Sequence, residues 1–275
     1  MGLMRLCDDD PLLDSLRDLF DATPLRTPED RIQPLTLLSR KGHQARFLGN
    51  VEHAIDAFKS PPTKSGSMAE LSGKQSRSVD AKLGINILSG FLSGFGVEAA
   101  GVASINFALQ DAVSVKFSFG QLERSYVDLV QLGREVAGRH LQRNNPALEI
   151  FLGDDSRHDL LIVDSVLRSG TFTLSVEATL TSKLSIDGPT VKNAIEGTGN
   201  FRSVDASDRA ITFSGKKKLP FAFSCAQIEL TTGGRIAGLT PGAAVRQLGA
   251  VSALEQGTAR SEPFFKETGL LVWEE

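Results

Sequence analysis

The four histidines and one aspartate-rich cluster are the residues of this chain that could take part in acid–base or metal chemistry. The densest ionisable cluster consists of Asp154, Asp155, His158 and Asp159. It directly precedes an apolar run that predicts a strand, so we interpret it as a solvated loop rather than a catalytic site. No carboxylate or cysteine stands at metal-ligand or triad spacing from the other histidines, which are His43, His53 and His140. These residues support no enzymatic function, although a site assembled from distant parts of the chain stays open.

The two cysteines, Cys7 and Cys225, are too few for a disulfide framework, and we expect both to be reduced. Cys7 stands just before Pro11–Phe20, where leucines recur at the spacing of an amphipathic helix. A cysteine beside such a helix can be S-acylated. A free thiol packed under the helix is the alternative.

Residues 66–74 have only a superficial likeness to a phosphate-binding loop. Six residues rather than four separate Gly66 from Gly73, and Gln75 stands where the magnesium-binding serine or threonine belongs. We therefore expect no metal and no cofactor, other than the covalent fatty acyl chain that Cys7 could carry.

The composition, with 41% hydrophobic and 23% charged residues, is that of a globular protein. The net charge of −3 argues against a nucleic-acid-binding protein. There is no run of about 18 apolar residues, and Asp8, Asp9 and Asp10 occupy the place where a signal peptide needs its apolar core. We expect the chain to be made and kept in the cytoplasm.

The elements that organise the chain begin with an alternation from Val79 to Phe119, the pattern of strands with one apolar face. From Ala103 to Phe119, eight of the nine odd positions are apolar. With turn residues at 98–102, the pattern predicts one long hairpin. Strands of soluble domains usually have about 5–6 residues, whereas a bilayer-crossing strand needs about 9–11. This hairpin is therefore long enough to cross a membrane.

A second alternating block predicts another long hairpin, somewhere within residues 160–200. Residues 160–167 are almost continuously apolar, interrupted by Asp164. From Phe172 to Ile186, seven of the eight even positions are apolar and the odd positions before Ile186 are polar. The chain thus contains two long amphipathic strand systems.

Residues 211–213 and 221–230 predict a further hairpin whose loop carries Lys216, Lys217 and Lys218. A solvated loop tip is one interpretation of this lysine run. Contact with lipid headgroups, worth about 1 kcal/mol per lysine, is the other.

The remaining patterns predict short elements around these strands. Strands are expected at 35–39 and 46–48, and helices at 51–58, 122–141 and 241–256. The C-terminal tail is densely apolar and must dock somewhere, because such a segment left in water is an aggregation hazard.

In its order of elements the sequence resembles the gasdermin family. The resemblance covers most of the chain, through the N-terminal helix, Pro28–Leu38, Phe47–Gly49, the hairpin at 79–119, and Asn145-Pro146 leading into 160–176. It rests on order and pattern, since no short invariant motif anchors it. With 275 residues and no large helical C-terminal domain, the chain is similar to the compact bacterial gasdermins, whose inhibitory element is a short C-terminal peptide.

The resemblance implies an α+β fold, in which one domain is built on a central twisted, mostly antiparallel sheet with surrounding helices. It divides the chain into a pore-forming domain at 1–245, a cleavable linker at 246–262 and an autoinhibitory peptide at 263–275. It implies a monomer that a protease, caspase-like or other and encoded nearby, activates by removing the peptide. The released domain would oligomerise, insert both hairpins into the inner membrane and kill the cell as an antiphage defence.

The same resemblance assigns roles to residues. The peptide's apolar residues are Phe264, Phe265, Leu270, Leu271, Val272 and Trp273, and residues that could precede the cut bond are Arg246, Leu248, Leu254 and Arg260. Membrane-inserting residues of the first hairpin are Leu83, Ile85, Ile87, Phe91, Phe95, Val97, Ile105, Phe107, Leu109, Val113, Val115 and Phe117. Those of the second hairpin are Leu160, Ile162, Val166, Phe172, Leu174, Val176, Leu180 and Leu184.

The first helix departs from the family pattern, because mammalian relatives use a basic helix to grip acidic lipid and this one is acidic. The resemblance to bacterial gasdermins favours acylation of Cys7. A fatty acyl chain there would supply part of the missing affinity for the membrane, although a single acyl chain anchors a protein only weakly. Headgroup contacts are otherwise expected from Lys64, Lys74, Arg77, Lys82 and the lysine run at 216–218. The competing function is a soluble β-rich lipid- or partner-binding module whose hairpins are permanent core strands.

Overall fold

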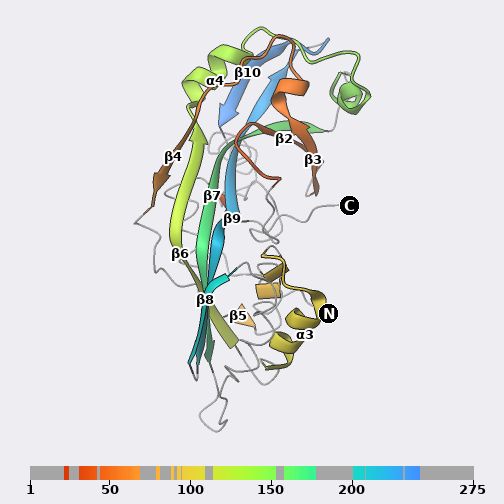
Figure 1. Cartoon of the computed structure of the whole chain (residues 1–275). Helices are drawn as coiled ribbons and strands as arrows, with labels where there is room; N and C mark the ends of the chain where they lie inside the picture. Colours follow the sequence, from red (N-terminus) through yellow and green to blue (C-terminus); the bar gives the residue numbers. More distant parts are fainter. Residues whose placement is uncertain are drawn as a thin grey trace, which may run out of the picture.

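The computed structural model describes residues 22–24, 31–41, 44–68, 79–80, 88–89, 92–93, 95–108, 114–152, 158–177, 201–207, 209–231 and 233–241. Ten strands in these ranges form one antiparallel sheet (Figure 1). They are β1 (Thr23–Pro24), β2 (Thr36–Lys41), β3 (Gln44–Asn50), β4 (Thr63–Ser67), β5 (Val79–Asp80), β6 (Ser114–Val127), β7 (Asp159–Glu177), β8 (Phe201–Ser207), β9 (Ala210–Leu230) and β10 (Ile236–Pro241). The helices are η1 (Val51–His53), α3 (Ala99–Ala108), α4 (Leu129–Val136) and η2 (Pro146–Phe151).

Three long strands, β6, β7 and β9, run through the whole sheet, with β7 in the middle. At one end they pair with β2, β4, β10 and β1, and at the other end with β5 and β8. We divide the sheet at Gly170 of β7. The lower sheet consists of β5, β8, residues 114–119 of β6, 171–177 of β7 and 210–215 of β9, and the remainder is the upper sheet.

The upper sheet is buried on both faces, which makes it the core of the molecule. Leu160 and Ile162 of β7 pack in a cluster with α4, η1 and η2. Leu161 and Val163 point to the opposite face, into a cluster with Ile32, Leu38 and Phe223 of neighbouring segments. Because both faces are covered, this part of β7 is apolar throughout instead of alternating.

Local capping explains the helices around this core. The side chain of Asp128 accepts hydrogen bonds from the backbone N–H groups of Val130 and Gln131, so it caps α4, which buries Leu132 and Val136. The side chain of Asn145 caps η2 in the same way, with Pro146 at its first position.

The structure confirms several predicted elements and corrects others. Strands β2 and β3 lie where the sequence predicts them, and η1 is a short form of the helix expected at 51–58. The helix expected at 122–141 is wrong for its first part, because residues 122–127 belong to β6 and α4 begins at Leu129. The cross-strand partners on β7 and β4 outweigh the helical spacing of these residues. The helices expected at 11–20 and 241–256 lie outside the described residues, apart from Pro241 at the end of β10.

The strand expected over 103–119 is also partly wrong, since residues 99–108 form α3. The adjacent positions 88–89 and 92–93 are helical as well, rather than extended. In the described part of the chain, no helix is long and apolar enough to cross a membrane.

Candidate functional site

The lower sheet has one apolar and one polar face. Directly paired residues of its three long strands are buried on the same face, and they are Val115, Phe119, Phe172, Leu174, Val176, Ile211 and Phe213. Between them, Thr171, Thr173 and Ser175 of β7 are only half-buried, and the hydroxyl groups of Thr173 and Thr212 lie 3.0 Å apart. The lower sheet therefore has the two-faced pattern that the sequence predicts for 114–119 and 172–177.

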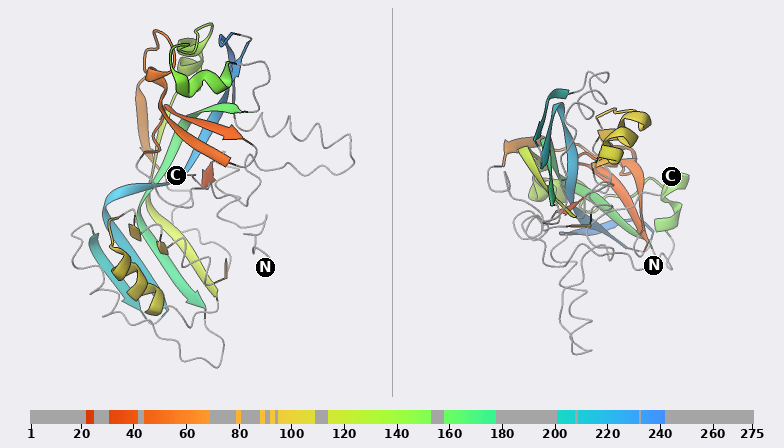
Figure 2. Two further views of the ribbon diagram at one scale, coloured as in Figure 1. Left: turned by 90° about the vertical axis from the view of Figure 1, so that its right-hand side faces the viewer. Right: turned by 90° about the horizontal axis from the view of Figure 1, so that it is seen from below.

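The segment that carries α3 lies against this lower sheet (Figures 1 and 2). Its buried side chains are Leu88, Leu92, Phe95, Val97, Val102 and Ile105. The ring of Phe95 packs directly on Gly215 of β9, and its centroid lies 5.0 Å from that of Phe201 on β8. Phe201 in turn lies 6.2 Å from Phe213, centroid to centroid. Part of the first predicted hairpin thus packs on β8 and β9, and β9 pairs with β7 of the second predicted hairpin.

All three long strands are irregular at the level of Gly170. Gln121 of β6 has a φ of +51°, in the left-handed region. On β9, four residues from Gly215 to Lys218 lie opposite Gly170 alone, between the pairs Ser169–Leu219 and Thr171–Ser214. The hydroxyl of Ser169 donates to the carbonyl oxygens of Gly120 and Thr171, each at 2.7 Å. An irregular β-bulge of four residues in β9 therefore separates the upper from the lower sheet.

The prediction that the lysine run at 216–218 forms a hairpin loop is wrong. These lysines lie in the bulge of one continuous strand, β9. Lys216 and Lys217 are exposed, whereas Lys218 donates to Glu123 of β6 at 2.8 Å. Pairing with β7 on both sides of the bulge keeps β9 continuous, which the local composition does not indicate. Lys64 is exposed on β4, 3.8 Å from Asp128. Lys74, Arg77 and Lys82 lie outside the described residues.

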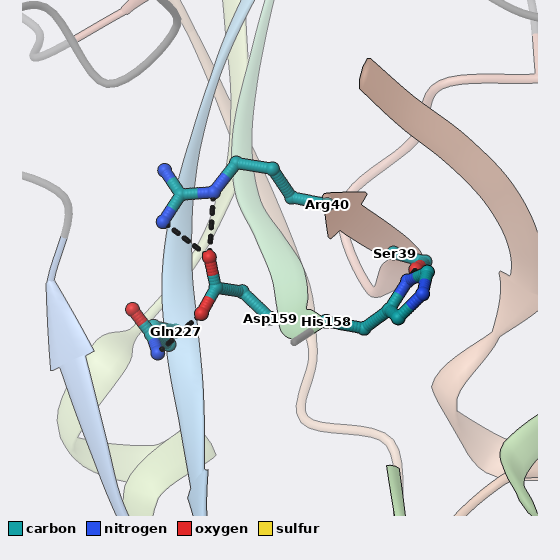
Figure 3. A network of polar contacts seen from close by, with 5 residues as sticks. All are labelled: Ser39, Arg40, His158, Asp159 and Gln227. Carbon is teal, nitrogen blue, oxygen red and sulfur yellow. Dashed lines mark hydrogen bonds and ion pairs between the residues drawn. The ribbon is translucent and has the colours of Figure 1, made fainter. Parts of the chain in front are cut away.

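The residues of the ionisable cluster that the structure describes join strands rather than form a catalytic site (Figure 3). Arg40 of β2 donates to one carboxylate oxygen of Asp159 from its Nε, at 2.8 Å, and from its Nη2. Gln227 of β9 donates to the other oxygen at 3.2 Å. His158 contacts the buried hydroxyl of Ser39 through Nδ1 at 3.2 Å. Both oxygens of the aspartate are thus used to tie β2 and β9 to β7.

No group of three or more His, Cys, Asp or Glu side chains is placed to hold a metal ion in the ranges that the structure describes. Asp154, Asp155 and His43 lie outside those ranges. His53 and His140 are exposed, and the thiol of Cys225 is buried in the upper core.

One buried carboxyl group stands out in the upper sheet. Asp164 lies at an irregularity between β7 and β9, and it accepts a 2.6 Å hydrogen bond from Ser224. Burial raises the pKa of this carboxyl above its ordinary value, against the smaller opposing effects of Ser224 and the Arg124 charge. The sequence showed Asp164 only as an interruption of an apolar run.

The residues predicted for the first hairpin fall into three groups. Phe95 and Val97 are buried beside α3, and Ile105 is buried within it, with Phe107 on the same helix. Val115 and Phe117 lie on β6, as expected for a strand. The others lie outside the described residues, and they are Leu83, Ile85, Ile87, Phe91, Leu109 and Val113.

The residues predicted for the second hairpin lie on β7 where they are described. Phe172, Leu174 and Val176 are on the apolar face of the lower sheet, and Leu160, Ile162 and Val166 are in the upper core. Leu180 and Leu184 fall outside the described ranges. The sequence analysis missed Ile211, Phe213 and Phe201 as partners of this face. The alternation at 211–213 was the available signal, but the adjacent lysines suggested a loop.

Several expectations fall on parts of the chain that the structure does not describe. They concern Cys7, the linker residues Arg246, Leu248, Leu254 and Arg260, and the tail residues Phe264, Phe265, Leu270, Leu271, Val272 and Trp273. Their proposed roles stay predictions.

Comparison with known proteins identifies the family. The chain matches the model of the Bacterial Gasdermin Family over residues 25–235. A gasdermin bGSDM from Vitiosangium sp. (strain GDMCC 1.1324) is 28% identical over 233 residues, covering 84% of this chain and 85% of that protein. A gasdermin bGSDM from a Desulfuromonadales bacterium is 23% identical over 272 residues, covering 95% and 98%.

The fold points the same way. A bacterial gasdermin structure from Bradyrhizobium tropiciagri aligns with a TM-score of 0.60 and 14% identity, over 86% of this chain and 94% of that one. It confirms the expected α+β fold on a central antiparallel sheet. Since the family model covers most of the sequence, this chain belongs to the bacterial gasdermins, a family of pore-forming proteins rather than enzymes.

Proposed function

We propose that this chain is a protease-activated pore former that is held inactive by its C-terminal peptide. The observation that carries the proposal is a conflict between pattern and structure in residues 99–108. From Ala103 onward the apolar residues alternate as in a strand, yet residues 99–108 form α3. A disagreement between local pattern and overall fold is expected at sites of function, here at a segment with a second conformation.

The side chains of α3 illustrate this conflict. Val102 and Ile105 are buried at helical spacing, whereas Ala103 and Ser104 are exposed. In a strand, Ala103 and Ile105 would share one face with the odd-numbered apolar residues that follow, and Ser104 would lie on the opposite face. The helix buries Ile105 without Ala103, whereas a strand would place both of them on its apolar face.

Release of the segment at 88–108 would uncover the apolar face of the lower sheet. Exposing this face to water is unfavourable, whereas contact with the lipid of a bilayer is favourable. We assign the membrane-inserting part of the second hairpin to the lower sheet and the residues beyond it, with Phe172, Leu174, Val176, Leu180 and Leu184. Leu160, Ile162 and Val166 have a different place in this proposal. They stay in the upper sheet outside the membrane, because both of its faces are already packed.

Insertion requires assembly of many copies. An open sheet in lipid would leave the backbone groups of its edge strands without partners, at several kcal/mol each, so the hairpins must close into a ring. The chain is accordingly a monomer before cleavage and a homo-oligomer after it.

Activation is assigned to the linker and the tail. A protease, caspase-like or other and encoded nearby, cuts near Arg246, Leu248, Leu254 or Arg260 and removes the peptide with Phe264, Phe265, Leu270, Leu271, Val272 and Trp273. Burial of an apolar side chain is worth about 1.5–3 kcal/mol, so losing this peptide is sufficient to shift the monomer toward assembly. The pore then forms in the inner membrane, starting from the cytoplasm, and kills the cell as a defence against phage.

Membrane attachment combines two sources of affinity. A fatty acyl chain on Cys7 would bring the chain to the bilayer, although one such chain binds only reversibly. Cationic side chains would add attraction to anionic headgroups, and they are Lys64, Lys74, Arg77, Lys82, Lys216, Lys217 and Lys218.

Dye release from liposomes tests the proposal. A site for a sequence-specific protease is placed in the linker at 246–262, and the full chain is added to dye-loaded vesicles with and without that protease. We expect release only after cleavage, and toxicity in bacteria from a chain that ends near residue 247. A cleaved protein that stays folded and monomeric while the vesicles remain sealed would instead support the soluble β-rich binding module.

A further inference from the structure

The lower end of β9 is paired on both of its edges. On one side lies β7, where Thr173 faces Thr212. On the other side lies β8, where Asp205 faces the same Thr212. In the described part of the chain, β8 pairs with no other strand, and it is joined to β9 by a tight turn in which Ser207 and Ala210 hydrogen-bond. Among the described strands it therefore forms one border of the lower sheet, and β5 forms the other.

The number of strands decides how two such sheets can join. The order across the lower sheet is β5, β6, β7, β9, β8, and every neighbouring pair is antiparallel. With five alternating strands, β5 and β8 point in the same direction. If two copies met head to tail around a ring, β8 of one copy would have to pair with β5 of the next in a parallel arrangement.

Removal of β8 changes this geometry. Four strands remain, and the new border strand β9 runs opposite to β5. Head-to-tail copies can then join by antiparallel pairing throughout, which is the arrangement of strands in membrane barrels, and an even number per copy is what such a barrel needs.

The two edges also differ in chemistry. The β9 edge under β8 has the sequence Ile211–Gly215, without charge or proline, and Ile211 and Phe213 are fully buried. The covering strand exposes polar and charged side chains, namely Arg202, Ser203, Asp205 and Ser207. Charged border strands are a common protection against pairing with other chains. The edge of β9 is thus suited to pairing with another strand, and the strand that covers it, β8, is not.

We propose that β8 is a removable cover, and that the β9 edge beneath it, at residues 211–215, is the surface to which the β5 border of a second copy of this chain binds. This inference rests on the proposed function, since it concerns how activated copies join. In the intact monomer β8 blocks that surface, and its departure from β9 is a required step of assembly.

Disulfide locks test this step in the full chain that carries the protease site in its linker. The pair Asp205→Cys with Thr212→Cys joins β8 to β9. The matched control, Thr173→Cys with Thr212→Cys, joins β7 to β9 and shares one position with it. A second pair on the β8 side, Ser203→Cys with Ser214→Cys, repeats the test at another facing position. Intact mass without reductant verifies each bond before the protein is cleaved in the presence of dye-loaded liposomes.

We expect the β8–β9 locks to abolish release and reductant to restore it, while the β7–β9 lock releases dye like the wild type. Release from oxidised β8–β9 locks at the wild-type rate would overturn the inference, as would equal inhibition by the β7–β9 lock. Failure of the cleaved wild type to release dye would instead refute the proposed function. Covalent cross-linking of the reduced and oxidised locks after cleavage adds a readout of assembly that does not depend on leakage.

Discussion

The ring of Phe95 lies against the backbone of Gly215, where a Cβ atom would come within 2.0 Å of the Phe95 Cε1 atom. No residue other than glycine fits this position of β9 without moving the ring. The contact joins the α3 segment of the first predicted hairpin to β9, which pairs with β7 of the second predicted hairpin. The first predicted hairpin is thus held against the lower sheet in this fold.

Replacement of Gly215 by alanine should weaken this attachment. The added methyl group must displace a fully buried ring, and overpacking of this kind costs about 1–3 kcal/mol. For a chain of this size, each kcal/mol lowers Tm by about 2–4 °C. Thermal unfolding measures the loss. Gly66→Ala on β4 is the control, because nothing lies within 4 Å of its Cβ position. Equal Tm values for the two variants would contradict the close contact.

Lysine substitutions in α3 should separate the helical from the extended state. Ala103 and Ser104 are both exposed in the helix, so a lysine at either position should leave Tm unchanged. In a strand, Ala103 lies on the apolar face and Ser104 on the polar face. A lysine facing lipid costs about 2–4 kcal/mol at the middle of the bilayer. After cleavage, we expect Ala103→Lys to lose dye release and Ser104→Lys to retain it. The same activity in both variants would mean that α3 does not become a membrane strand.

Asp164, in the upper sheet, should make stability depend on pH. Because burial raises its pKa in the folded chain, the folded state holds this proton more tightly than the unfolded state, in which the carboxyl has its ordinary pKa of 3.8. Its contribution to stability therefore falls as pH rises from that value through the raised one. Asp164→Asn keeps the acceptor for Ser224 but cannot ionise. We expect the wild type to gain stability relative to this variant as pH is lowered, in urea unfolding at a series of pH values. A difference that is constant with pH would show that Asp164 is not protonated preferentially in the fold.

Acylation of Cys7 predicts a defined change of mass. Protein purified from its own host should exceed the sequence mass by one fatty acyl chain, and Cys7→Ala should remove the excess. Cys225→Ala is the control, since this thiol is buried and should not be modified. An intact mass equal to that of the sequence would exclude the modification.

The sequence was sufficient to predict those strands whose alternation of apolar and polar residues agrees with their pairing in the sheet. The alternation in 114–119 and 172–177 predicts strands with one apolar face, and β6 and β7 have that face buried. The continuous apolar run at 160–163 predicts a strand, and β7 contains it, although only the structure shows that both of its faces are buried in the upper core. The family could be recognised for the same reason, because the order of such elements is a property of the sequence.

The sequence determined the apolar and polar faces of the long strands, but its predictions of a strand at 103–108 and of a loop at 216–218 were wrong. Residues 103–107 continue the period of two, but in this fold the apolar face of the lower sheet needs a cover, and a helix with Val102 and Ile105 buried provides it. Three lysines in succession indicate a loop, yet β7 pairs with β9 on both sides of them and keeps the strand continuous. Only the tertiary structure placed β8 on the edge of β9. Such a pairing depends on which edge lies free after the other strands have assembled, and the pattern within one segment carries no information about that edge.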